Sequence, residues 1–225
     1  MLATTLKPAL PFPPAALSLV VAVLATPALA QDADTTQQVV IVGNGTEQRA
    51  FDTPYAVSVV DAATMRSAGP MVNLSESLSR VPGLAVNSRQ NYAQDLQISS
   101  RGFGARSTFG VRGIRLYADG VPASTPDGQG QVAHFDLANA QRVEVLRGPF
   151  SALYGSSSGG VIALVSARPA RPEASLGADF GADGLRQWRS SIESPLEGGF
   201  DLRLSASGFH TDGLRPQSAA DRRLF

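Results

Sequence analysis

The most regular pattern of hydrophobic and polar positions lies between residues 174 and 207. Apolar side chains occupy every second position in three runs, with charged or small polar side chains between them: ASLGADFG, WRSSIE and FDLRLSAS. A period of two is typical of β-strands. Asp183–Gly184 and Glu197–Gly199 separate the runs and are turn signals for antiparallel hairpins. The pattern predicts three strands with one apolar face, which either contacts lipid in a membrane or packs inside a sandwich with one wet face.

A mixed pattern covers residues 49 to 169. In LSESLSRV, the side chains of Leu74, Leu78 and Val81 fall on one helical face before Pro82 and Gly83 end the helix. Short β-branched runs, joined by glycine-rich loops, predict strands at residues 57–60, 114–117, 142–146 and 161–165. The mixture predicts a compact α+β domain of about 120 residues.

The first thirty residues have the layout of a secretory signal peptide. Lys7 precedes an apolar run of small residues, and Ala28, Leu29 and Ala30 form an A-x-A cleavage site. The run is shorter than the roughly 20 residues that a membrane-spanning helix requires. We therefore expect cleavage after Ala30 and a mature chain that begins at Gln31. Export to the cell envelope favours membrane strands over a sandwich for the alternating region.

Composition narrows the chemistry. The chain has 225 residues, balanced charge, two histidines and no cysteine. These counts exclude disulfides, thiolate metal sites and a cysteine nucleophile. A histidine metal site is not expected either, because His134 and His210 are far apart in sequence. Without a basic excess, no nucleic-acid partner is expected.

Two motifs suggest enzymes but lack the required context. VVIVGNG resembles the start of a dinucleotide-binding fold, yet Gln48 stands where the third glycine belongs and Pro54 interrupts the helix that should follow. Residues 155–159 read G-x-S-x-G, and Asp201 and His210 follow Ser157 in the order of a hydrolase triad. A nucleophile elbow requires a strand before the serine and a helix after it, whereas here a β-type run follows. His210 lies past the last strand pattern, where we expect a polar loop.

Arginine and glycine alternate in RGFGARSTFGVRGIR, where Arg101, Arg106, Arg112 and Arg115 fall close together. Guanidinium groups bind carboxylate or phosphate, so this cluster is either an anion-binding surface or a set of structural arginines. Few acids lie nearby in the sequence, which favours partners supplied by a surrounding element. Glu144 and Arg147 in VEVLRGP also need partners if their strand is half-buried.

Four segments, in this order and spacing, resemble the plug domain of TonB-dependent outer-membrane receptors: TPYAVSVVDAATM, NLSESLSRVPGLAVNSR, RGFGARSTFGVRGIRLYADGVPASTPDGQGQ and RVEVLRGPFSALYGSSSGGVIALVSARP. QQVVIV, ahead of them, is similar to the TonB box of that family. TDGLRPQSAADRR resembles a stretch that follows an early barrel strand, and PDGQGQ is most similar to the ferric-dicitrate branch.

The resemblance implies an α+β plug domain followed by the first strands of an antiparallel transmembrane β-barrel of about 22 strands. Residues 1–30 would be the signal peptide, 31–48 the TonB box with a flexible linker, 49–169 the plug, and 170–225 an incomplete start of the barrel. Such a protein is not an enzyme. It sits in the outer membrane of Gram-negative bacteria and has no cofactor, because iron is present only in the transported chelate.

The resemblance also assigns roles to residues. Val39, Val40, Ile41 and Val42 would bind TonB, which works with its inner-membrane energising complex. Plug–barrel ion pairs would involve Arg101, Glu144 and Arg147, while Arg106, Phe109, Arg112, Ser124, Asp127 and Gln129 would face the ligand. The partners implied are TonB, outer-membrane lipid and a metal chelate, a ferric siderophore or ferric citrate.

The alternatives from other classes are a free periplasmic binding or signalling module made of the plug alone, and the secreted serine hydrolase. We also expect the chain to end in an outer loop before a fourth strand, because Ala219, Asp221 and Arg223 lack apolar alternation. Three strands with two open edges could not reside in a bilayer, since their unpaired backbone groups would face hydrocarbon. The chain alone is therefore not expected to transport.

Overall fold

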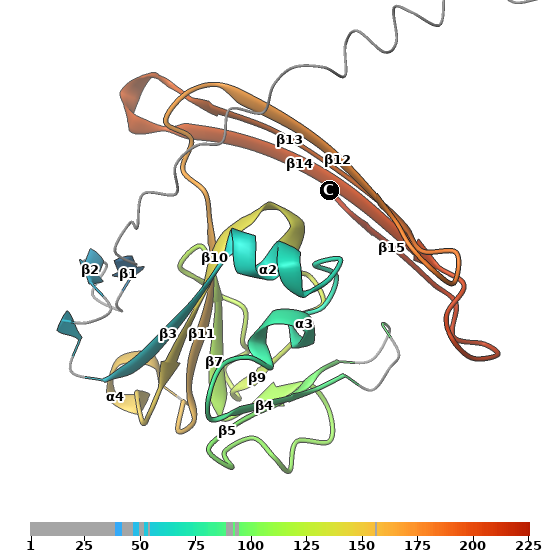
Figure 1. Ribbon diagram of the computed structural model, residues 1–225. Coiled ribbons are helices and arrows are strands. Elements are labelled where there is room, and N and C mark those ends of the chain that lie inside the picture. The colour runs from blue at the N-terminus through green and yellow to red at the C-terminus, as the bar shows by residue number, and fades with distance from the viewer. Residues whose placement is uncertain are drawn as a thin grey trace, which may run out of the picture. The chain divides into compact units, whose positions relative to one another are not determined.

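The computed structural model describes residues 39–41, 47–49, 52–53, 55–88, 92, 95–155 and 157–225. The signal-peptide prediction lies outside these residues. The described chain forms an α+β domain, which we call the plug, and a sheet of long strands, which we call the wall sheet (Figure 1).

The plug is organised around a five-stranded sheet in the order β3-β10-β11-β7-β8. Its strands are β3 (Ala56–Asp61), β7 (Ile114–Ala118), β8 (Val121–Pro122), β10 (Ala140–Arg147) and β11 (Gly160–Ser166). The pairs are antiparallel except β11–β7, which is parallel. The near-continuous apolar run of β11 and the buried residues 143–146 of β10 fit positions inside the sheet, where both faces are covered.

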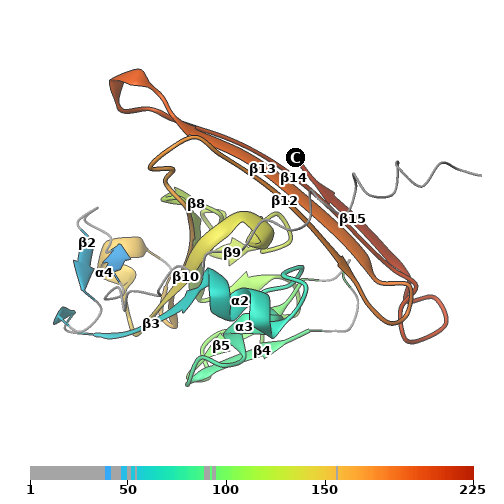
Figure 2. The same ribbon diagram turned by 45° about the horizontal axis from the view of Figure 1, so that its top comes forward.

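Two short helices cover this sheet and lie next to one another (Figure 2). Asp61 is the N-cap of helix α2 (Ala62–Ala68), and its carboxylate accepts the N–H of Thr64 at 2.7 Å. That hydrogen bond lowers the pKa of Asp61. Helix α3 (Ser75–Leu78) buries Leu74, Leu78 and Val81 in the core, which confirms the predicted apolar face. Helix α2 was not predicted from the hydrophobic pattern.

Smaller elements complete the plug. They are β4 (Leu84–Asn87) paired with β5 (Gln97–Ser100), β6 (Val111–Arg112) paired with β9 (Gln129–Gly130), the 3-10 turn η2 (Leu137–Asn139) and helix α4 (Ser151–Tyr154). Gly104 lies between β5 and β6 with a φ of 86°, and a Cβ there would come within 2.7 Å of two backbone oxygens. A glycine is therefore required for the close approach of these segments.

The wall sheet contains four strands in sequence order, all antiparallel: β12 (Glu173–Phe180), β13 (Arg186–Pro195), β14 (Asp201–Thr211) and β15 (Ala220–Leu224). The 3-10 turn η3 (Glu197–Gly199) joins β13 to β14. Large apolar side chains are exposed on one face, with Leu176 85% exposed, whereas Gln187, Ser191, Ser207 and Thr211 are buried on the other. Among the described helices, none is long and apolar enough to cross a membrane.

The wall sheet corrects two expectations. A fourth strand, β15, pairs with β14 from Ser207↔Leu224 to Thr211↔Ala220, so residues 220–224 are not an outer loop. The polar loop expected at His210 is also absent, because His210 lies within β14. The alternation of apolar and polar residues is lost in β15 because charged residues occupy its exposed positions. Pairing with β14, rather than the local pattern, therefore makes this segment a strand.

Ahead of the plug, β1 (Val39–Ile41) pairs antiparallel with β2 (Glu47–Arg49). Three of the predicted TonB-contact residues therefore have extended backbone. Val42 lies outside the described residues.

Candidate functional site

Hydrogen bonds join the wall sheet to the plug, and two arginines of the wall strands are donors. Arg203 of β14 donates to the carbonyl oxygen of Asn139, and Ser205 donates to Asp136 Oδ2 at 2.9 Å. Arg222 of β15 donates to the carbonyl oxygens of Val72, Ala133 and Phe135. The wall therefore holds two plug segments, residues 71–76 and 133–139. We call this contact the seam.

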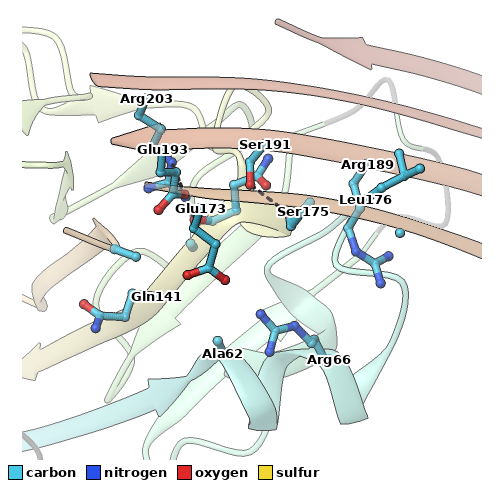
Figure 3. Close-up of a pocket in the computed structure, with 15 residues that line it drawn as sticks. Ala62, Arg66, Gln141, Glu173, Ser175, Leu176, Arg189, Ser191, Glu193 and Arg203 are labelled. Atoms are coloured by element: carbon cyan, nitrogen blue, oxygen red, sulfur yellow. Dashed lines mark hydrogen bonds and ion pairs between the residues drawn. The ribbon is translucent and has the colours of Figure 1, made fainter. Parts of the chain in front are cut away.

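Beside the seam, a cavity of about 400 Å³ lies between the plug and the wall sheet (Figure 3). Its lining is rich in charge. Arg66 projects from α2, while Glu173, Arg189, Glu193 and Arg203 come from the wall strands. Arg203 Nε lies 3.1 Å from Glu193 Oε1, and Arg189 pairs with Asp179. The balance of charges makes the gap polar without selecting an anion or a cation.

A second site lies where β6 pairs with β9 and the loop before β9 folds back toward Arg112. Arg112 Nη2 donates to Gln129 Oε1 at 2.7 Å and lies 3.5 Å from Asp127 Oδ2. Asp127 also accepts from Thr125, and this hydrogen bond lowers the pKa of Asp127. Asp127 and Gln129 line a cavity of about 530 Å³. Three of the predicted ligand-facing residues thus converge.

The other predicted ligand-facing residues do not join this group. Phe109 is 74% exposed, and Arg106 is exposed in the same loop. Ser124 is buried, and its Oγ accepts from the N–H of Leu116 at 3.0 Å, so it supports β7. The expectation that nearby acids are too sparse for the arginines is wrong for Arg112, because the chain folds Asp127 back against it.

A third cavity, of about 320 Å³, lies at the end of the wall sheet farthest from the turn between β13 and β14. It is lined by the plug residues Ser88 and Tyr92 and by residues of two wall turns: Ala182, Asp183, Leu185, Thr211, Gly213, Leu214, Arg215 and Ser218. We call it the end cavity. The Tyr92 ring packs on Phe209 of β14, with centroids 5.1 Å apart. Burial and the nearby Glu76 carboxylate raise the pKa of Tyr92.

Two of the residues predicted for plug–barrel ion pairing, Glu144 and Arg147, have side-chain partners inside the plug. Glu144 is fully buried and forms its ion pair with Arg142 at 2.7 Å. Arg147 donates to the carbonyl oxygen of Pro82 and to Ser58 Oγ. Arg101 occupies a turn with a φ of 48°, and its backbone N–H donates to the carbonyl oxygen of Gly83. Pairing of Arg101 and Arg147 with barrel glutamates stays a prediction.

The hydrolase triad does not form. Ser157 is buried in the loop before β11, whereas His210 in β14 has its two ring nitrogens paired with Asp221 and Asp212, at 2.8 and 3.2 Å. Among the described residues, no group of three or more His, Asp or Glu side chains is placed to hold a metal ion.

Sequence reasoning missed Arg203, Arg222 and Tyr92. One feature of the sequence could have revealed such residues: an arginine at an inward-facing position of a strand, where a lone charge requires a partner across the interface. Arg203 fits this description within the predicted third strand, but Arg222 could not be found this way because its strand was not predicted. Tyr92 lies in a polar loop that has no periodic pattern.

The structure thus combines an α+β domain, polar cavities and a sheet with an apolar outer face, as expected for a plug domain followed by the first strands of a barrel. Residues 49–162 match the family model of the TonB-dependent receptor plug domain, and the chain belongs to this family. The predicted family, fold class and absence of an enzyme activity are thereby confirmed.

Relatives with different named ligands share this region. The chain is 32% identical to a hemin receptor of Yersinia pestis over 184 residues, which cover 80% of this chain and 24% of the relative. It is 28% identical to the vitamin B12 transporter BtuB of Vibrio vulnificus, covering 82% of this chain and 30% of that one. The crystal structure of the ferric yersiniabactin uptake receptor FyuA from Yersinia pestis has a TM-score of 0.56 and 29% identity, covering 72% of this chain and 25% of that structure. The chain thus spans about a quarter of the length of these relatives.

Proposed function

We propose that this chain is the N-terminal part of an outer-membrane receptor that takes up a metal chelate with energy delivered by TonB. The observation that carries the proposal is the combination of a family plug with a wall sheet whose outward face is apolar. A lipid environment suits such a face, while the plug and its polar seam suit a lumen. A free plug-like module in the periplasm would leave Leu176, Ile192 and Leu204 exposed to water.

The periplasmic contact would be β1. In the two-stranded sheet β1–β2, β1 pairs on one side with β2, and its other edge can accept a further strand from TonB. Affinity would come from backbone hydrogen bonds. Ile41→Pro should therefore abolish binding by removing an N–H donor and fixing φ, whereas Ile41→Thr, which keeps the β-branch, should be milder.

This is tested by titrating the TonB C-terminal domain with a peptide of residues 31–50. Strong loss for Ile41→Pro and modest loss for Ile41→Thr are expected. Equal affinities of the wild-type and Pro peptides would refute strand addition at this segment.

The ligand would be a metal chelate bound on the outer side of the plug. We place a ferric siderophore or ferric citrate first, because the cluster of Arg106 and Arg112 suits an anionic chelate. In the structure, the guanidinium of Arg112 meets Gln129 and Asp127 beside an open cavity. Hemin and cobalamin are the alternatives suggested by the relatives.

To test the ligand class, the complete receptor is titrated with ferric citrate, hemin and cyanocobalamin. Arg106→Ala and Arg112→Ala should weaken ferric citrate binding by about tenfold, as expected for loss of a charge-assisted contact. Their thermal midpoints should stay close to wild type. Unchanged affinity with a lowered midpoint would show that these arginines are structural.

A further inference from the structure

The backbone of Val72 is held from both sides. Its N–H donates to Glu76 Oε1 at 3.3 Å, and its carbonyl oxygen accepts from Arg222 Nη1. The Glu76 carboxylate also accepts the N–H groups of Met71 and Asn73, at 2.7 and 3.0 Å. Burial raises the pKa of Glu76, and these three N–H groups and Arg222 act in the opposite direction. The loop between α2 and α3 therefore lies between a plug carboxylate and a wall guanidinium.

Arg222 holds a second loop with its other terminal nitrogen. Nη2 donates to the carbonyl oxygens of Ala133 and Phe135, the latter at 3.2 Å. Phe135 is among the largest fully buried side chains of the core, so the position of this loop is also fixed by packing. One side chain of the wall thus joins two loops that are about 60 residues apart in the sequence.

The chemistry of this contact requires arginine. A guanidinium presents several N–H donors in a planar, rigid fork and remains charged, so it can serve three carbonyl oxygens at once. A lysine ammonium is a compact point charge and cannot reproduce that geometry. Arg223, the next residue, is exposed and makes none of these contacts.

Tyr92 connects this contact to the end cavity. Tyr92 and Arg222 line a common small cavity of about 40 Å³, together with residues of both loops. Tyr92 also lines the end cavity and packs on Phe209, which belongs to the strand that pairs with β15. A shift of the 71–76 loop would therefore change the shape of the small cavity that it shares with Tyr92.

We propose that Arg222 is a positioning residue that fixes the 71–76 and 133–136 loops against the wall and so sets the place of Tyr92 at the end cavity. The proposal rests on the proposed function only in giving that cavity a role in ligand binding. Its structural content does not depend on TonB or on any chelate.

The test uses the natural absence of cysteine. Single cysteines are introduced in the complete receptor as Val72→Cys, at the seam, or Val143→Cys, in the core of the plug sheet. Both valines are buried. Maleimide labelling rates, without ligand, are then compared in the Arg222→Met and Arg223→Met backgrounds.

Arg222→Met should raise the labelling rate at position 72 by about tenfold or more, the effect of losing charge-assisted hydrogen bonds, while position 143 stays protected. Arg223→Met should change neither. Arg222→Lys should behave like Arg222→Met. If Arg222→Met fails to fold, Arg222→Gln, which keeps a donor for one carbonyl, carries the same comparison.

Three results would overturn the proposal: no change at position 72, an equal rise at both positions, or complete rescue by lysine. An equal rise would mean that Arg222 stabilises the whole plug rather than these loops. Because labelling needs neither ligand nor TonB, a failed uptake assay with local labelling at position 72 would count against the proposed function alone.

Discussion

The plug sheet and the wall sheet differ in which side chains they bury. In the plug, Val143, Val145 and Ile162 are inaccessible on central strands, and the strands pack against a core built from the plug's own helices and loops. In the wall sheet, the protected face carries Gln187, Ser191 and Ser207, and apolar side chains lie on the open face. The strands of one chain thus have residue patterns that suit two different environments. The plug carries its own core, whereas the wall sheet covers its polar face with the plug and leaves its apolar face open.

The largest effect is expected from a matched pair of substitutions that shorten a side chain to alanine. Phe135→Ala should lower the free energy of unfolding of the receptor by about 3–5 kcal/mol, because it leaves a cavity in a closed core. Leu204→Ala, on the open face of β14, should cost less than about 1 kcal/mol. Urea denaturation in detergent measures both. Similar losses would mean that Leu204 packs in a core of its own.

A charge on the open face tests whether that face meets lipid. Leu176→Arg should destabilise the receptor folded in lipid vesicles by about 2–4 kcal/mol, the range for arginine near the midplane. The inward-facing neighbour offers a control, since Ser175→Arg points toward the polar cavity. An unaffected Leu176→Arg receptor would place this face in water.

The helix cap of the plug should give a smaller, pH-dependent effect. Asp61→Ala should remove about 1 kcal/mol of stability at neutral pH by leaving the N–H of Thr64 without its acceptor. The pKa of Asp61 is lowered by folding, so its stabilisation is complete above the ordinary value of 3.8 and is lost as the pH falls through the folded pKa. Asp61→Asn keeps an acceptor but does not titrate. In thermal melts from pH 2 to 7, the stability difference between the wild type and either variant should depend on pH. The stability difference between the Ala and Asn variants should not.

The smallest expected effect is at the wall. Arg189 and Asp179 form a half-exposed ion pair across β12 and β13, beside a polar cavity. Arg189→Met should change stability by less than about 1 kcal/mol, because partly solvated pairs contribute little. The effect should shrink further in high salt. A loss of several kcal/mol of stability would show that water does not enter the cavity beside the seam.

The sequence predicts those features that local periodicity determines. Leu74, Leu78 and Val81 indicate one helical face, and the alternation after Ala174 indicates three wall strands. The fourth strand escapes prediction because Arg222 and Asp221 are placed by pairing with β14, which is a non-local contact. The pair of Arg112 and Asp127 is missed for the same reason, since a chain reversal brings the two residues together. The arginine contacts of the seam are made to backbone carbonyl oxygens on the plug side. Every residue type has one, so the sequence does not mark these positions.

The strand order of the plug has a mechanical consequence. β3 is an edge strand and has a single strand neighbour, β10, with pairs from Ala56↔Arg147 to Asp61↔Arg142. A pull applied to the chain ahead of Ala56 would reach β3 before any other strand of this sheet. Detaching β3 breaks one ladder of hydrogen bonds, whereas removing β10 or β11 breaks two. The sheet would therefore yield first at its β3 edge, before the hydrogen bonds between β10 and β11 break.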